Sequence, residues 1–196
     1  MIAAALLACA ISADHSTDVH PETMKKIIMG ESGGNPYAVN VNRYSGPQPH
    51  PTTKEEAIAV AQRFIAAGYS VDLGESQINS GNLGSLGYTL SDAFDDCTNV
   101  RGGGTILTSF YRQAAEKYGP GQQAALAAIS AYNTGSFYRG FANGYVAKII
   151  GIPDVPLPDF PRVAAAEKPK AVAPRPDPYT ATTQVYSRVS YNVPIH

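Results

Sequence analysis

Apolar side chains recur at helical spacing along most of the first 151 residues, and glycine, proline and capping residues separate the periodic stretches. The first stretch has Pro21 in its opening turn, and the second opens with Thr53 and Glu56 in capping-box spacing. Five segments are predicted to be helices: 20–32, 53–68, 105–119, 121–135 and 142–150. Of these, 121–135 is nearly all alanine and leucine on one side, which predicts the central buried helix.

Two shorter segments carry a different pattern. Residues 38–51 alternate and then become rich in turn residues, which predicts a short strand or hairpin, and residues 69–79 predict an extended piece that enters a turn. Beyond the last helix the sequence is dense in proline and has no sustained period. The predicted fold is therefore α+β and mainly helical. It comprises an N-terminal segment over 1–19, a domain with a small β element over 20–151, and a proline-rich, flexible tail over 152–196.

Composition narrows the function classes. The chain has 196 residues and a formal net charge of −1, which argues against a sequence-independent nucleic-acid binder, since such proteins carry a basic surplus. No apolar run reaches the roughly 18 residues of a spanning helix, so stable membrane insertion is not expected. The four histidines are scattered and no metal-binding motif occurs, so neither a metal nor a cofactor is predicted.

The N-terminal sequence "MIAAALLACA" allows two interpretations. It is either the end of a secretory signal, with Ala8 and Ala10 placed as in a cleavage site, or a buried first helix. The only cysteines, Cys9 and Cys97, fit either a disulfide formed in an oxidising compartment or two inert buried thiols. A disulfide through Cys9 requires that the segment is retained, so the signal and the disulfide interpretations compete.

The triplet Gly-Glu-Ser occurs twice, and its two glutamates sit in different contexts. Glu31 ends a hydrophobic helix, where burial and the negative end of the helix dipole both disfavour the carboxylate. A raised pKa is therefore expected at Glu31, as a general acid requires. Glu75 lies in a glycine- and serine-containing turn, where nearby water predicts an ordinary pKa.

Three motifs follow one another in a fixed order: "ESGGNPYAVN" from Glu31, "GESQIN" from Gly74 and "AYNTG" from Ala131. Together they resemble the lysozyme-like lytic transglycosylases over residues 20–150. The sequence is most similar to the transglycosylase component of type IV secretion systems. There too a helix like "TKEEAIAVAQRFIAAG" precedes the glutamine turn, and a segment like that at 95–102 follows it.

The resemblance assigns roles to particular residues. It implies that Glu31 is the catalytic acid and that Glu75 falls on a variable, usually apolar position. It also implies that Cys9 pairs with Cys97. The substrate-binding residues that it implies are Ser32, Gln77, Asn79, Tyr132 and Asn133. One departure is Asn40, which stands where many relatives carry a serine.

The resemblance implies a peptidoglycan lytic transglycosylase with one catalytic carboxyl and no cofactor. Glu31 would protonate the bond between N-acetylmuramic acid and N-acetylglucosamine and then help to close a 1,6-anhydro ring. Two alternatives stay open: a hydrolytic muramidase with Asp72 or Glu75 as second carboxylate, and a peptidoglycan-binding assembly factor with vestigial activity. The expected location is the periplasm. The expected partners are glycan strands and secretion-system components, the latter bound through the tail.

Overall fold

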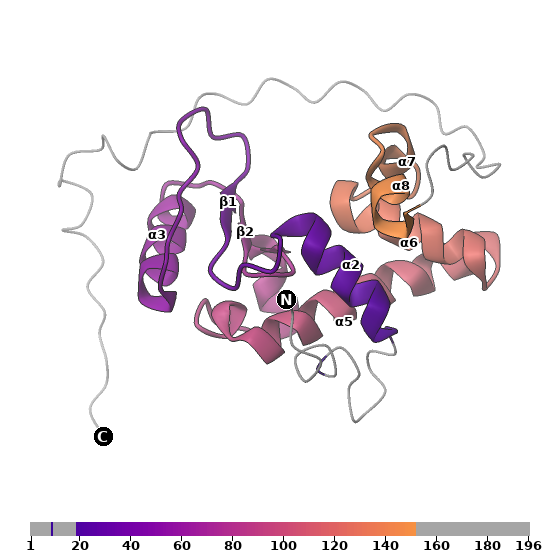
Figure 1. The fold of residues 1–196 in the computed structure, drawn as a ribbon, viewed down its shortest axis with the longest axis horizontal. Helices are drawn as coiled ribbons and strands as arrows, with labels where there is room; N and C mark the ends of the chain where they lie inside the picture. The colour runs from indigo at the N-terminus through magenta and orange to yellow at the C-terminus, as the bar shows by residue number, and fades with distance from the viewer. Residues whose placement is uncertain (1–8, 10–18, 152–196) are drawn as a thin grey trace.

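The computed structural model describes Cys9 and residues 19–151, and Figure 1 traces the chain. The predictions for the rest of the N-terminal segment and for the tail over 152–196 lie outside the described residues. The described part is mainly helical with one small sheet, so the predicted fold class is confirmed. Its helices are α2 (Pro21–Glu31), α3 (Lys54–Ala66), α4 (Leu83–Leu86), α5 (Asp96–Tyr118), α6 (Gln122–Thr134), α7 (Arg139–Ala142) and α8 (Tyr145–Ile150). Its strands are β1 (Val39–Val41), β2 (Val71–Leu73) and β3 (Ile78–Asn79), and short 3₁₀ turns are η1 (Ser80–Asn82) and η2 (Asp92–Phe94).

The helix starts follow local chemistry. Pro21 occupies the first turn of α2, and the Thr53 side chain accepts a hydrogen bond from the Glu56 backbone N–H at the start of α3. The Glu56 carboxylate accepts hydrogen bonds from the backbone N–H and the hydroxyl of Thr52, and the Thr53 backbone N–H also stabilises it. The predicted pair of Thr53 and Glu56 thus caps the N-terminus of α3, with Thr52 as an additional donor.

The three strands form an antiparallel sheet in the order β1-β2-β3. Its register places Asn40 opposite Asp72 and Asp72 opposite Asn79, so these polar residues share one face. The alternate positions Val39, Val41, Val71, Leu73 and Ile78 are buried on the other face. The sheet therefore has an apolar side that packs toward α3 and a polar side that is free to line a cleft.

Two predicted helix boundaries were wrong. The prediction began a helix at residue 105, whereas α5 starts at Asp96, with the Asp95 side chain capping Thr98. Glycines 102–104 disfavour a helix locally, but packing overrides that preference, because a Cβ on Gly103 would lie 2.8 Å from the Ser76 Cβ. The predicted helix 142–150 starts too early: Ala142 ends α7, and α8 starts only at Tyr145, because Gly144 adopts φ 79° between them.

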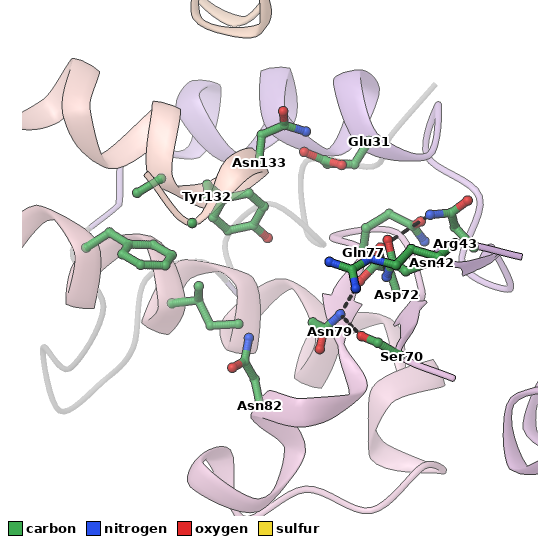
Figure 2. A pocket seen from close by; sticks show the side chains of 15 residues that line it. Glu31, Asn42, Arg43, Ser70, Asp72, Gln77, Asn79, Asn82, Tyr132 and Asn133 are labelled. Atoms are coloured by element: carbon green, nitrogen blue, oxygen red, sulfur yellow. Dashed lines mark hydrogen bonds between the residues drawn. The ribbon is translucent and has the colours of Figure 1, made fainter. Parts of the chain in front are cut away.

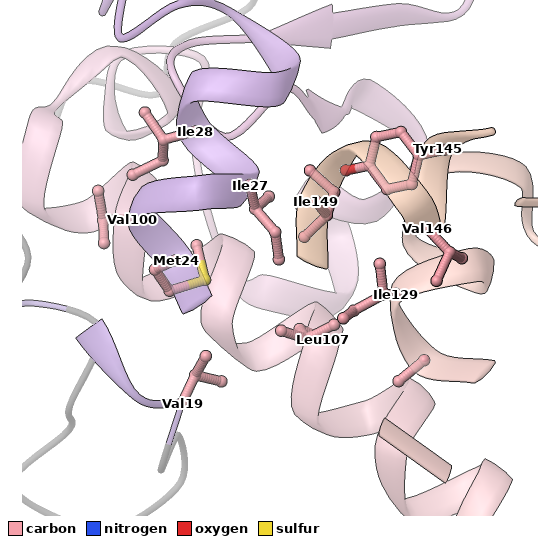
Figure 3. Close-up of a cluster of buried hydrophobic side chains, with 11 residues drawn as sticks. Val19, Met24, Ile27, Ile28, Val100, Leu107, Ile129, Tyr145, Val146 and Ile149 are labelled. Carbon is pink, nitrogen blue, oxygen red and sulfur yellow. The ribbon is translucent and has the colours of Figure 1, made fainter. Parts of the chain in front are cut away.

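Two apolar clusters flank the middle of the molecule. One joins α3 to the apolar side of the sheet, with Phe64 fully buried. The other joins α2, α5, α6 and α8, and Figure 3 shows Met24, Ile27 and Ile28 of α2 at its centre. In Figure 1 the sheet and α3 lie on one side, α6, α7 and α8 lie on the other, and α2 and α5 pass between them. A disulfide joins Cys9 to Cys97 in the first turn of α5.

Candidate active site

A cleft of about 940 Å³ lies between the polar side of the sheet and the helices (Figure 2). One wall consists of residues of β1, β2, β3 and the turns beside them, and the opposite wall consists of the C-terminal end of α6. Glu31 reaches the cleft from the end of α2, and Ile106 and Phe110 of α5 add apolar surface. Five of the six predicted catalytic and binding residues line it, namely Glu31, Gln77, Asn79, Tyr132 and Asn133, and the sixth, Ser32, does not.

Glu31 is the carboxyl group at the end of the helix that anchors the larger apolar cluster. Burial raises its pKa, and the nearby negative charge of Asp72 raises it further. The Tyr145 hydroxyl donates a hydrogen bond to Glu31 Oε1, and this bond lowers the pKa of Glu31. The positive charge of Lys148 lowers the pKa as well, by less. Burial is the largest effect, so Glu31 keeps its proton to a higher pH than an ordinary glutamate.

Close packing of α8 on α2 brings Tyr145 to Glu31. A Cβ on Gly30 would lie 2.6 Å from Ile149 Cδ1, so a larger residue there would force the buried Ile149 side chain to shift. The Lys148 Nζ donates to the Gly30 carbonyl oxygen over 2.8 Å and closes the same contact. No motif predicted Tyr145, and its one available signal was a polar-tipped aromatic residue in a short helix that is apolar apart from Lys148.

Tyr132 and Asn133 form the wall of the cleft on the α6 side. The Tyr132 hydroxyl donates to the Ser76 carbonyl oxygen over 2.7 Å, which ties α6 to the turn between β2 and β3. Burial raises the pKa of the Tyr132 phenol, and the neighbouring Glu31 raises it further, so the phenol stays neutral. Asn133 is exposed, and its Oδ1 accepts from the Asn143 side chain over 3.1 Å.

Asp72 faces the cleft from the middle strand and is held by three amides. Its Oδ2 accepts from Asn42 over 2.9 Å and from Asn40 over 3.3 Å, and its Oδ1 accepts from Asn79 over 2.7 Å. Asn79 also donates to the Ser70 hydroxyl, so both hydrogens of its amide are used within the protein. Asn40, which departs from the family pattern, is thus a hydrogen-bond donor to Asp72.

Gln77 and Ser32 belong to one tight junction between α2 and the β2–β3 turn. Gln77 has φ 50°, an uncommon conformation for a residue other than glycine, and its Nε2 donates to the Gly74 carbonyl oxygen over 2.8 Å. Its side chain lines the cleft. The Ser32 hydroxyl donates to the Glu75 carbonyl oxygen over 2.8 Å and is not part of the cleft wall. Ser32 therefore positions the turn that carries Gln77.

The expected environment of Glu75 was wrong. Its side chain is only 2% exposed, and its Oε1 has no hydrogen-bond partner. Burial, with the negative charges of Asp96 and Asp95, raises the pKa of the Glu75 carboxyl to about 7. Glu75 does not line the cleft, whereas Glu31 does. Of the two Gly-Glu-Ser glutamates, only Glu31 therefore belongs to the candidate site.

Two further properties concern the described residues alone. No three His, Cys, Asp or Glu side chains among them are grouped as metal ligands. None of the helices that they form is long and apolar enough to cross a membrane.

A half-buried glutamic acid that faces an amide-lined strand across an open groove is an arrangement suited to acid-catalysed cleavage of a sugar chain. Residues 8–149 match the family model described as "Transglycosylase SLT domain", and the chain belongs to this family.

The chain is also similar to curated proteins that bear the name virB1. The chain is 40% identical over 143 residues to the "Type IV secretion system protein virB1" of Brucella abortus, which covers 70% of this chain and 60% of that protein. It is 39% identical over 132 residues to "Protein virB1" of Agrobacterium fabrum, covering 67% of this chain and 53% of that protein. The chain thus spans about half to three fifths of the curated relatives it matches. No solved structure matches it.

Proposed function

We propose that the chain is a peptidoglycan lytic transglycosylase that opens the cell wall locally for a type IV secretion apparatus. The single observation that carries the proposal is Glu31, a carboxyl with a raised pKa at the end of a buried helix, facing a large cleft. Membership of the transglycosylase family and similarity to two virB1 proteins support the reaction class and its setting. The periplasm is the compartment where such a substrate lies, and the disulfide fits its oxidising conditions.

In the proposed reaction, Glu31 first acts as a general acid. It gives its proton to the oxygen that links N-acetylmuramic acid to N-acetylglucosamine, and the acetamido group of the muramyl residue assists at the anomeric carbon. The resulting Glu31 carboxylate then removes the proton from the muramyl C6 hydroxyl, whose oxygen closes the 1,6-anhydro ring. The proton returns to Glu31, so no water is consumed and the acid is regenerated.

The neighbours of Glu31 have separate parts in this reaction. The Tyr145 hydroxyl donates to the carboxyl oxygen and steadies the carboxylate that forms after proton transfer. Tyr132 provides one apolar wall, while Gln77 and Asn133 present amides to the sugar groups. Ser32 acts indirectly, by fixing the turn that carries Gln77.

Asp72 favours a second candidate, a hydrolytic muramidase. Of the two carboxylates considered as partners for Glu31, Asp72 lines the cleft and Glu75 does not. In a retaining or inverting hydrolase, Asp72 would stabilise the positive sugar or position water. The two candidates share Glu31 as the acid, and they differ in whether the product carries an anhydro ring or a reducing end.

Mutation of each Gly-Glu-Ser glutamate tests the assignment. Glu31→Gln is expected to abolish the release of fragments from purified sacculi, because it removes the transferable proton with little change of shape. Glu75→Gln is the matched control: it makes the same change in a carboxyl outside the cleft and is expected to keep a substantial fraction of activity. An inactive Glu75→Gln variant beside an active Glu31→Gln variant would contradict the assignment.

A further inference from the structure

Arg43 is a cleft residue to which neither the motifs nor the reaction assigns a role. It lies just beyond β1 and is exposed, and among the residues that the structure describes it is the one basic side chain on the wall of the cleft. Figure 2 shows its side chain on the sheet side, near Gln77 and Asn79 and opposite Tyr132. The other charged groups there are Glu31 and Asp72.

The backbone at Arg43 is held in an unfavourable conformation. Its φ is 62°, a region that residues with a Cβ rarely adopt. Both neighbours are fixed. The Asn42 N–H donates to the Ser70 carbonyl oxygen over 2.9 Å, and the Tyr44 ring packs edge-to-face on Phe64 with centroids 4.9 Å apart. Strained residues of this kind are concentrated at functional sites.

The Arg43 guanidinium has no partner among the described residues. The nearest candidate by charge is Asp72, but no ion pair joins the two, and the oxygens of Asp72 already accept from three asparagine amides. Arg43 thus presents the planar donor set that best matches a carboxylate, and it presents this set to the cleft.

The substrate class offers one kind of anion. Along a peptidoglycan strand, the muramyl sugars carry an O3 lactyl group that ends in a carboxylate or in a peptide with carboxylates of its own. An anionic substituent would be repelled by Asp72 unless a cation lay nearby. We propose that Arg43 binds a carboxylate of the muramyl O3 substituent and makes the cleft selective for acidic over neutral glycan strands. This inference rests on the proposed function for its substrate class.

Binding to an inactive form tests Arg43 without depending on cleavage. Full-length Glu31→Gln protein is titrated with three muramyl-containing tetrasaccharides: one with free lactyl carboxylates, one with acidic stem peptides, and one with lactyl carboxamides. One or both acidic ligands are expected to bind about 5- to 10-fold more tightly than the carboxamide, as a charge-assisted pair in a partly exposed cleft would give. The stronger of the two identifies the source of the carboxylate.

Variants at position 43 decide the outcome. In the Glu31→Gln protein, the additional change Arg43→Gln is expected to remove the preference for acidic ligands and to leave binding of the carboxamide unchanged. Arg43→Lys in its place is expected to keep part of that preference. Arg112→Gln, on α5 outside the cleft, makes the same charge change and is expected to have no effect. An equal preference with and without Arg43, or an equal loss for all three ligands, would overturn the inference. Cleavage of sacculi by the unmodified protein is scored separately, so failure of the proposed function is seen there.

Discussion

The buried Glu75 carboxyl makes a quantitative prediction about stability. The folded protein keeps the Glu75 proton up to a pKa of about 7, whereas the unfolded chain releases it near the ordinary value of 4.5. Between these values the folded state binds more protons, so its stability must fall as pH rises. The slope is about 1.4 kcal/mol per pH unit, and the total between pH 4.5 and pH 7 is about 3 kcal/mol. Above pH 7 the loss is complete.

Glu75→Gln should remove this dependence because glutamine does not ionise. Urea unfolding of the unmodified protein and the variant gives a free-energy difference at each pH. That difference is expected to shift by about 3 kcal/mol in favour of the variant between pH 4.5 and pH 8. Taking the difference cancels the other titrating groups.

Two further variants sharpen the measurement. Glu116→Gln alters an exposed carboxyl on α5 and is the control for the loss of one negative charge. Glu75→Met also removes the unpartnered Oε1, so it is expected to stabilise the protein above pH 7 and to do so more than Glu75→Gln. A free-energy difference for Glu75→Gln that stays constant from pH 4.5 to pH 8 would refute the reasoning.

Three other predictions follow from the same structure. Tyr145→Phe removes a hydrogen bond that favours the Glu31 carboxylate, so the basic limb of the pH profile for cleavage should move to higher pH; an unmoved limb would count against the contact. Replacing Cys9 and Cys97 by serine opens a loop spanning 88 positions and should cost up to about 4–5 kcal/mol in urea unfolding, and free thiols in exported protein would contradict the pairing. A chain that ends at Gly151 should still cleave sacculi but lose co-purification with secretion components, and loss of cleavage would place the tail in the catalytic domain.

Sequence alone predicts the elements whose signals are local. The apolar stripe and Pro21 define α2, and Thr53 defines the start of α3. The early start of α5 could not be predicted, because three successive glycines disfavour a helix by roughly 1 kcal/mol each. Close packing favours two of them: a Cβ on Gly103 would meet Ser76, and a Cβ on Gly102 would meet Ile78 and Tyr88. These are contacts with residues far away in the sequence.

In the candidate site, too, features with a local signal could be predicted and features that depend on long-range contacts could not. The local context of Glu31, at the end of an apolar helix, predicts its raised pKa correctly. The local context of Glu75 predicts a hydrated turn, and the error arises because α5 covers this turn with Asp95, Asp96 and the glycines. Tyr145 is 114 residues away from Glu31 in sequence, so no spacing rule could join them. The asparagine amides that donate to Asp72 reach it through the strand register, which the alternating pattern does not fix.

Mass spectrometry of the fragments released from purified sacculi tests the proposed reaction most directly. If Glu31 acts alone and the muramyl C6 oxygen closes the ring, the fragments carry 1,6-anhydromuramic ends and lack the mass of one water. The same digestion with Glu31→Gln releases none of these fragments. Fragments from the unmodified protein that carry reducing ends and the added mass of water would contradict the transglycosylase reaction and assign the cleft to hydrolysis with Asp72.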